Sequence, residues 1–247
     1  MDCAGITRRY YAHWLGVAPD DLVRPGVRFV FSAERDVIPK GYARRLDVYG
    51  WVSGDCVVVS YGSGAQAMIA RLEERLCGVP DAQALALAMQ AVWSVTPGDN
   101  IKYVVDELPK MTHAAHRMAP DDFALYHDFF LMCHPNARDT SWLKEYFDEI
   151  VERGLCYGVI EGGMLVSIND LPDMPYMADE VQEIGINTAP AYRGRGLARR
   201  VCLSCAHAMA DRGICPQWST TRDNIASQKL ARALGFVPLA DVVTLTL

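Results

Sequence analysis

The sequence lacks a long apolar run, an excess of positive charge and a recognisable leader. A membrane-spanning helix needs about 20 consecutive apolar residues, and no stretch approaches that length. The N-terminus, Met1-Asp2-Cys3-Ala4, has neither the basic nor the apolar segment of a secretory signal. The formal net charge is -6, whereas nucleic-acid binding depends on an excess of Lys and Arg. We therefore expect a cytoplasmic protein with no membrane partner and no nucleic-acid partner.

The cysteines and histidines show no pattern typical of a disulfide framework or a metal site. The eight cysteines are scattered through apolar segments, which predicts reduced, buried thiols. Cys202-x-x-Cys205, followed by His207, falls in the middle of a predicted helix and has no second pair of ligands. His113-x-x-His116 likewise has no Cys or carboxylate at ligand spacing. We expect no metal in this protein.

The composition is that of a globular protein long enough for one large or two small domains. Of the 247 residues, 51% are hydrophobic and 22% are charged. A cluster of helix- and strand-breaking residues at 96–100 precedes a strand predicted at 101–108. We place a domain boundary near residue 112, between a small α+β domain at 1–112 and a second domain at 113–247.

Apolar spacing predicts the elements of both domains. In the first domain we expect the end of a helix at 10–15, strands at 27–32 and 56–60, and helices at 66–76 and 82–94. In the second domain we expect helices at 123–132 and 140–151, a hairpin turning at Gly162-Gly163, and one strand at 181–188. A helix from 197, a strand at 214–221, a helix at 224–234 and one or two strands at 236–247 follow. The fold class is therefore α/β with a mixed sheet.

A glycine-rich segment, Tyr192-Arg193-Gly194-Arg195-Gly196-Leu197-Ala198, joins the strand at 181–188 to the helix from 197. We call residues 192–198 the glycine loop. Glycine lets the backbone turn tightly, and the helix that follows directs its unpaired N–H groups and the positive end of its dipole at the loop. Arginines at 193, 195, 199 and 200 add positive charge in an acidic protein. The segment predicts a site for the diphosphate of a small molecule.

The spacing Arg193-x-x-Gly196-x-Ala198 resembles the coenzyme signature of the Gcn5-related N-acetyltransferase (GNAT) family. The resemblance extends to Asn224, Ser227 and Leu234-Gly235-Phe236, and covers roughly residues 115–247 in the family's order of elements. It implies an acetyltransferase fold in the C-terminal half and acetyl-CoA as the co-substrate. The N-terminal extension and Pro216-x-Trp218 look like a bacterial subgroup of the family that includes antibiotic self-resistance enzymes.

The resemblance also implies which residues hold the coenzyme. Backbone N–H groups of Gly194, Arg195, Gly196, Leu197 and Ala198 would face the diphosphate. Ile186 and Thr188 would offer backbone groups to the pantetheine arm and polarise the thioester. Arg193 adds charge, and Asn224 and Ser227 would hold the same arm, although Asn224 also fits a helix N-cap.

The sequence offers several candidates for the acid and the base. In the family, a tyrosine four residues before the glycine of Gly-Phe protonates the thiolate, but here that position is Ala231, so solvent or another tyrosine, Tyr192 or Tyr176, would serve. Glu183 is the candidate base because it lies on the strand that carries the thioester donors. Glu180 and Asp179 are alternatives.

These features predict an N-acetyltransferase that takes acetyl-CoA to a primary amine, in which the first domain shapes the acceptor site. One alternative is an acyl-CoA-binding regulatory module with weak or no turnover, which the missing tyrosine favours. A second alternative is an interaction protein in which the glycine loop is only a helix start.

Overall fold

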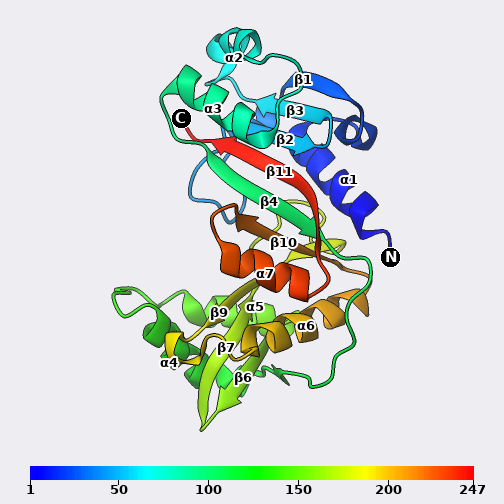
Figure 1. Ribbon diagram of the computed structural model, residues 1–247. Coiled ribbons are helices and arrows are strands. Elements are labelled where there is room, and N and C mark those ends of the chain that lie inside the picture. The colour runs from blue at the N-terminus through cyan, green and yellow to red at the C-terminus, as the bar shows by residue number, and fades with distance from the viewer.

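A computed structural model describes residues 1–247, which form a mixed seven-stranded β-sheet and an antiparallel four-stranded β-sheet, surrounded by seven α-helices (Figure 1). The helices are α1 (Cys3–Leu15), α2 (Ile69–Arg75), α3 (Ala82–Trp93), α4 (Phe123–Cys133), α5 (Leu143–Glu152), α6 (Leu197–Ala210) and α7 (Ile225–Ala233). The strands are β1 (Gly26–Phe31), β2 (Val48–Ser53), β3 (Cys56–Tyr61), β4 (Gly98–Val104), β5 (His116–Arg117), β6 (Tyr157–Glu161), β7 (Met164–Asp170), β8 (Val181–Glu183), β9 (Gly185–Thr188), β10 (Cys215–Thr221) and β11 (Val237–Leu245). The predicted α/β class is confirmed.

The larger sheet runs through both halves of the chain. Its strand order is β1-β3-β2-β11-β4-β10-β8, and the smaller sheet has the order β5-β6-β7-β9. β4, from the first half, pairs antiparallel with β10 on one side and with β11 on the other, and both of these strands come from the second half. β11 also pairs with β2. The two halves are therefore joined by backbone hydrogen bonds across one sheet, and the predicted boundary at residue 112 remains a proposal.

Helices cover both faces of the strands contributed by the first half. On one face α1 packs its aromatic side chains against Trp51 and Val58, and on the other α3 packs Leu85 and Met89 against Val57. Covering both faces explains why β2 and β3 are apolar at nearly every position instead of alternating.

The structure adds one strand and divides another. The sequence analysis missed β2, whose apolar run is interrupted by Gly50; a Cβ at Gly50 would lie 2.7 Å from a methyl group of Leu85, so glycine allows α3 to approach. The single strand expected at 181–188 is wrong: β8 belongs to the larger sheet and β9 to the smaller one. The chain passes between them at Ile184, which is buried and donates its N–H to the carbonyl of Gln217 at 3.0 Å.

The expectation that all eight cysteines are reduced is wrong for two of them. A disulfide joins Cys3 of α1 to Cys215 of β10, 212 positions apart, and the other six cysteines are free thiols. Among these, Cys202 and Cys205 lie in the core, where burial raises the pKa of both thiols. No three His, Cys, Asp or Glu side chains gather as metal ligands, and no helix has the length and apolarity to cross a bilayer.

Candidate active site

The glycine loop turns into α6 with its backbone exposed. Gly194 and Gly196 have φ values of +75° and +77°, a region that side chains other than glycine rarely adopt. A Cβ at either position would meet nothing within 4 Å, so the space above the loop is open. Open space and left-handed backbone together allow another molecule to approach the peptide groups closely.

The start of α6 has no partner for its first N–H groups from within the helix. The first helical hydrogen bond runs from Arg200 N to Gly196 O, no side chain caps the terminus, and no acidic residue lies in the first turn. The N–H groups of Leu197, Ala198 and Arg199 therefore point outward, at the positive end of the dipole. This arrangement suits a phosphate group.

A wedge-shaped opening lies beside this terminus because the chain leaves the larger sheet after β8 and enters the smaller sheet as β9. β8 pairs with β10 in parallel as far as Glu183, and β9 then pairs with β7 in the other sheet. Ala189 N donates a hydrogen bond to Val166 O. Because hydrogen-bonded and non-hydrogen-bonded residue pairs alternate along an antiparallel ladder, the backbone of Asn187 is hydrogen-bonded to β7, whereas the backbone groups of Ile186 and Thr188 are not. The backbone N–H and C=O groups of Ile186 and Thr188 consequently face the open edge, toward β10.

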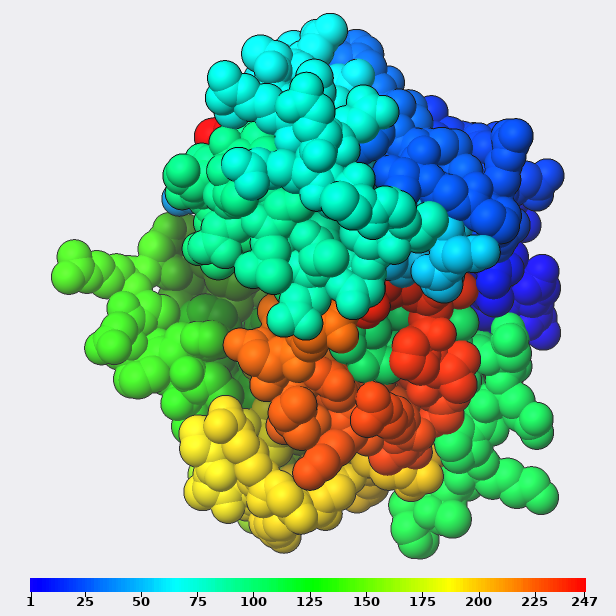
Figure 2. Space-filling view, turned by 45° about the horizontal axis from the view of Figure 1, so that its top comes forward, coloured from blue at the N-terminus to red at the C-terminus, as the bar shows by residue number.

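A cavity of about 900 Å³ fills this wedge between β9, β10, α6 and α7. The glycine loop, coloured yellow to gold, lies beside the orange residues of α7 at the molecular surface (Figure 2). All but one of the eleven predicted site residues line the cavity: Glu183, Ile186, Thr188, Arg193, Gly194, Gly196, Leu197, Ala198, Asn224 and Ser227. The volume is in the range of cofactor sites in proteins.

The arginines around the loop are each tied to another part of the protein. Arg193 donates from Nε to Thr188 O at 3.1 Å and lines the cavity. Arg195 does not line it: its guanidinium lies 3.0 Å from the carboxylate of Glu161 and over the ring of Tyr192. Arg199 and Arg200 donate to backbone carbonyls of other segments. At position 195, only the backbone remains as a candidate contact.

Asn224 and Ser227 stand at the start of α7, on the side of the wedge opposite β9. The side-chain oxygen of Asn224 accepts from Ser227 N at 3.1 Å, so the N-cap expected as one of its roles is present. Ser227 Oγ accepts from Trp218 Nε1 at 3.0 Å. The amide N–H₂ of Asn224 and the hydroxyl hydrogen of Ser227 are left to bind a molecule in the cavity.

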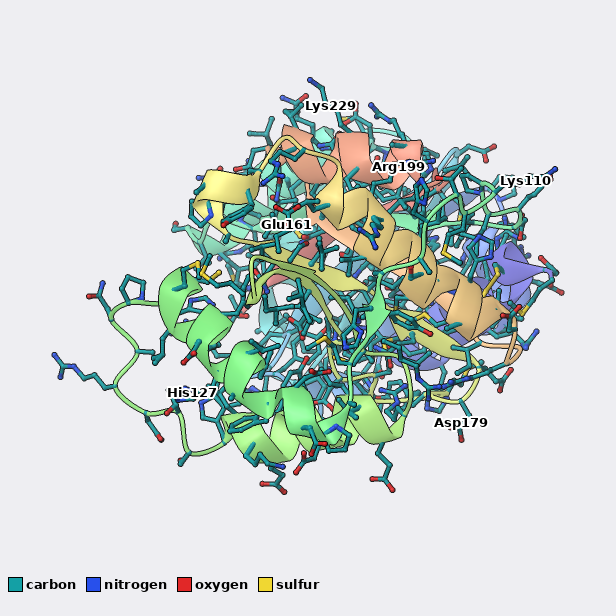
Figure 3. All side chains as sticks on the ribbon, turned by 90° about the horizontal axis from the view of Figure 1, so that it is seen from below. Lys110, His127, Glu161, Asp179, Arg199 and Lys229 are labelled. Carbon is teal, nitrogen blue, oxygen red and sulfur yellow. A yellow bond between two sulfur atoms is a disulfide. The ribbon has the colours of Figure 1, made fainter.

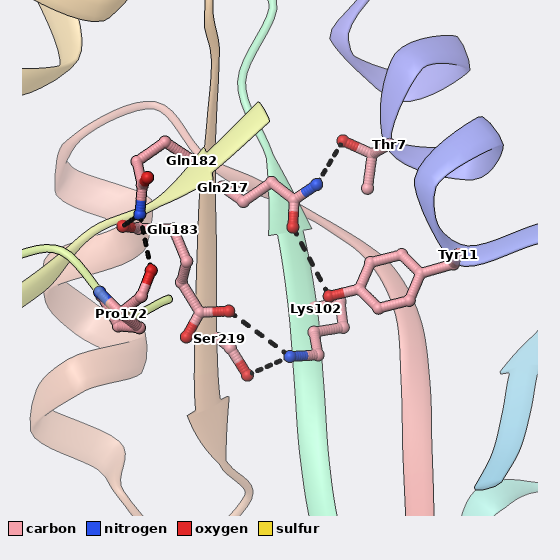
Figure 4. A network of polar contacts seen from close by, with 8 residues as sticks. All are labelled: Thr7, Tyr11, Lys102, Pro172, Gln182, Glu183, Gln217 and Ser219. Atoms are coloured by element: carbon pink, nitrogen blue, oxygen red, sulfur yellow. Dashed lines mark hydrogen bonds and ion pairs between the residues drawn. The ribbon is translucent and has the colours of Figure 1, made fainter. Parts of the chain in front are cut away.

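Glu183 is paired with Lys102, which is itself anchored by Ser219 (Figure 4). Its carboxylate lies 3.5 Å from Lys102 Nζ of β4, and the same ammonium donates to Ser219 Oγ of β10 at 2.8 Å. Burial acts to lower the pKa of Lys102, but Glu183 and neighbouring tyrosine oxygens outweigh burial and raise it above its ordinary value. Lys102 therefore stays protonated and fixes the Glu183 carboxylate at the end of the wedge.

The other candidate acids do not line the cavity. Glu180 forms an exposed ion pair with Arg9 at 2.9 Å. Asp179 projects outward at the edge of the molecule, away from Arg199 at the start of α6 (Figure 3). Of the three carboxylates considered from the sequence, Glu183 is the one that faces the cavity.

The structure also distinguishes between the candidates for the proton donor. Ala231 is fully buried in the core of the second half and does not line the wedge cavity. Tyr176 donates to Glu34 at 2.6 Å and packs near Trp14, whereas Tyr192 lines the wedge cavity. Tyr192 is therefore the candidate proton donor that the geometry supports.

The sequence analysis missed Lys102 and Ser219. Lys102 interrupts the apolar positions Ile101 and Tyr103 of β4, and a lone lysine in a buried strand was the available signal. Its partner Glu183 lies 81 positions away, so local spacing carries no information about the pair.

One segment of the chain matches a known protein family. Residues 136–241 match the family model described as GNAT acetyltransferase, so the chain contains a domain of that family. No curated protein sequence matches the chain. This confirms the family inferred from the glycine loop.

Two solved structures share the fold. An acetyltransferase of the GNAT family from Colwellia psychrerythraea has a TM-score of 0.51 and 22% identity, over 64% of this chain and 60% of that chain. A GCN5-related N-acetyltransferase from Sphaerobacter thermophilus has a TM-score of 0.52 and 16% identity, over 65% of this chain and 55% of that chain. The chain thus spans about three fifths of the length of these proteins.

Proposed function

We propose that the protein is an N-acetyltransferase that transfers the acetyl group of acetyl-CoA to a primary amine of a small molecule. The observation that carries the proposal is the wedge between β9 and β10, which joins the free N–H groups of α6 at one end to Glu183 at the other. The GNAT domain at 136–241 supports the acetyltransferase class.

The cavity residues fit a coenzyme A thioester, which supplies an activated acetyl group. The N–H groups of Leu197 and Ala198 would hold the diphosphate, with added charge from Arg193. The outward-facing backbone groups of Ile186 and Thr188 would pair with the pantetheine arm, and one N–H would stabilise negative charge developing on the thioester oxygen. The amide of Asn224 and the hydroxyl of Ser227 would hold the arm from the opposite wall.

Glu183 would accept a proton from the acceptor amine. The amine nitrogen then forms a bond to the thioester carbon, the carbon–sulfur bond breaks, and the thiolate leaves with the bonding electrons. The nitrogen, which still carries one proton more than the amide product, loses that proton, and Tyr192 or solvent relays it to the sulfur. Because Lys102 holds the carboxylate in place, Glu183 is positioned before the amine arrives.

A substitution pair tests the role of Glu183. Glu183→Gln should bind acetyl-CoA, observed as thermal stabilisation, but release free thiol with amines about 10²- to 10⁴-fold more slowly, the usual contribution of a general base. Glu180→Gln removes a carboxylate three positions away that does not line the cavity, and should keep full activity. Equal activity of the two variants would reject Glu183 as the base.

The alternative of an acyl-CoA-binding regulatory module with weak or no turnover draws support from the buried Ala231. It predicts stabilisation by acetyl-CoA and no thiol release with any amine. The cytoplasmic location inferred from the sequence remains a prediction, as does the absence of a nucleic-acid partner.

A further inference from the structure

A second, smaller cavity of about 150 Å³ adjoins the candidate base on its other side. Its walls are aromatic: Tyr10, Tyr11 and Trp14 of α1, and Tyr42 and Tyr49. Its charged lining residues are Lys102, Glu183 and Asp173, and the carboxylate of Asp173 is already paired with Lys40 at 3.2 Å. Glu183 lines both this cavity and the wedge cavity. We call this cavity the aromatic pocket. A molecule bound in it would meet the same carboxylate that faces the thioester end of the wedge.

The aromatic pocket presents hydrogen-bond donors that the protein leaves unused. The tyrosine hydroxyls with protein partners are those of Tyr11, Tyr146 and Tyr176. The hydroxyls of Tyr10, Tyr42 and Tyr49 are therefore available, as is the third N–H of Lys102, which bonds only to Glu183 and Ser219. Donors gathered around an ammonium suit an anionic group.

The aromatic pocket also limits the size of its occupant. A cavity of about 150 Å³ holds a molecule the size of benzene, that is, roughly six non-hydrogen atoms. An alanine-sized molecule fits, whereas a sugar or a nucleoside is too large to be enclosed.

The balance of charge during the proposed reaction indicates which charged group the bound molecule has. Lys102 is mostly buried, with 13% of its side chain exposed, and Glu183 is its anionic partner. When Glu183 accepts the amine proton it becomes neutral, and Lys102 is left as a buried cation without a counter-charge, which is strongly unfavourable. An acceptor with its own carboxylate next to Lys102 would restore the balance. Its amine, still protonated before the transfer, would meet the Glu183 carboxylate and the faces of the surrounding rings.

We propose that the aromatic pocket binds the acceptor, and that the acceptor is a small amino acid of about alanine size. Its carboxylate lies against Lys102 and the free tyrosine hydroxyls, and its amine lies against Glu183, facing the wedge cavity. This inference rests on the proposed acetyltransferase function and names its substrate class.

The test compares alanine with alaninamide, which has the same size and amine but no carboxylate. Two readouts are recorded for each compound: quenching of tryptophan fluorescence on binding, because Trp14 lines the pocket, and thiol release from acetyl-CoA. We expect alanine to be favoured by about 10- to 100-fold in both, the range given by one hydrogen bond to a charged group.

Two variants assign the preference to the pocket. Lys102→Met should abolish the preference for alanine. Tyr42→Phe, which removes one hydroxyl from a partly exposed side chain, should weaken alanine binding more than alaninamide binding, because hydrogen bonds to a charged group are the stronger ones. Tyr61→Phe, on the far side of β3 from this pocket, serves as the matched control and should behave like the unaltered protein.

The outcomes separate the two proposals. Alaninamide acetylated as well as alanine, or alanine neither bound nor acetylated, would overturn the substrate class while leaving the transferase function standing if any amine releases thiol. Alanine bound in a Lys102-dependent manner without thiol release from any amine would support the ligand class and overturn the transferase function.

Discussion

Replacing Gly196 by Val should abolish coenzyme binding while leaving the protein folded. Gly196 has a φ of +77°, so a side chain there adds strain of about 1–2 kcal/mol. For a chain of this length, that strain lowers the melting temperature by roughly 2–8 °C. The new side chain would also fill the open space above the loop and keep a phosphate from the N–H groups of α6. Losing two hydrogen bonds to a charged group, about 1.5–3 kcal/mol each, weakens affinity roughly 10²- to 10⁴-fold.

Gly213 provides a matched control at the other end of the same helix. Its φ is +74°, and a Cβ there also meets nothing within 4 Å, so Gly213→Val introduces equal strain roughly 20 Å from the loop. Thermal stabilisation by acetyl-CoA measures affinity: a ligand at a hundred times its dissociation constant adds about 2.7 kcal/mol. Gly213→Val should keep this gain and Gly196→Val should lose it. If both variants retain the gain, the diphosphate does not bind at the glycine loop.

Two further predictions concern α7 and the buried tyrosines. Asn224→Asp keeps an N-cap oxygen but loses the amide donors, so it should weaken acetyl-CoA binding without loss of stability. Asn224→Ala should weaken binding and also lower the free energy of unfolding by about 0.5–2 kcal/mol in urea titrations. If both variants bind acetyl-CoA as tightly as the unaltered protein, the amide of Asn224 is not a contact. Burial raises the pKa of Tyr11 and Tyr49 well above 10, so only the unfolded chain loses these protons near pH 10, and stability should fall as pH rises above 10. Tyr49→Phe should reduce that slope by about 1.4 kcal/mol per pH unit, and an unchanged slope would show that Tyr49 does not contribute.

Local patterns were sufficient to predict the elements around the wedge cavity. Glycines at 194 and 196, followed by the apolar face of the next helix, specify a turn and a helix start through backbone conformation alone, and the structure has both. Asn224 is likewise a local signal, since its side chain caps the helix that it precedes. Ten of the eleven predicted site residues therefore line one cavity.

Features that depend on long-range pairing could not be predicted. The break at Ile184 arises because β8 and β9 join different sheets, while the local sequence at 181–188 predicts a single strand. Lys102 meets Glu183 only because β4 lies next to β10, and Cys3 meets Cys215 only because α1 packs on that sheet. None of these neighbours is encoded by spacing, because each depends on the order of strands in the complete sheet.

The position of β4 also determines how the protein can be divided. A fragment that starts at residue 113 would contain β10 and β11 but lack the strand that fills the space between them. Each would then present an unpaired backbone edge, and such edges attract strands from other molecules. Any shortened version made for expression therefore has to begin ahead of Gly98, so that β4 stays together with residues 113–247.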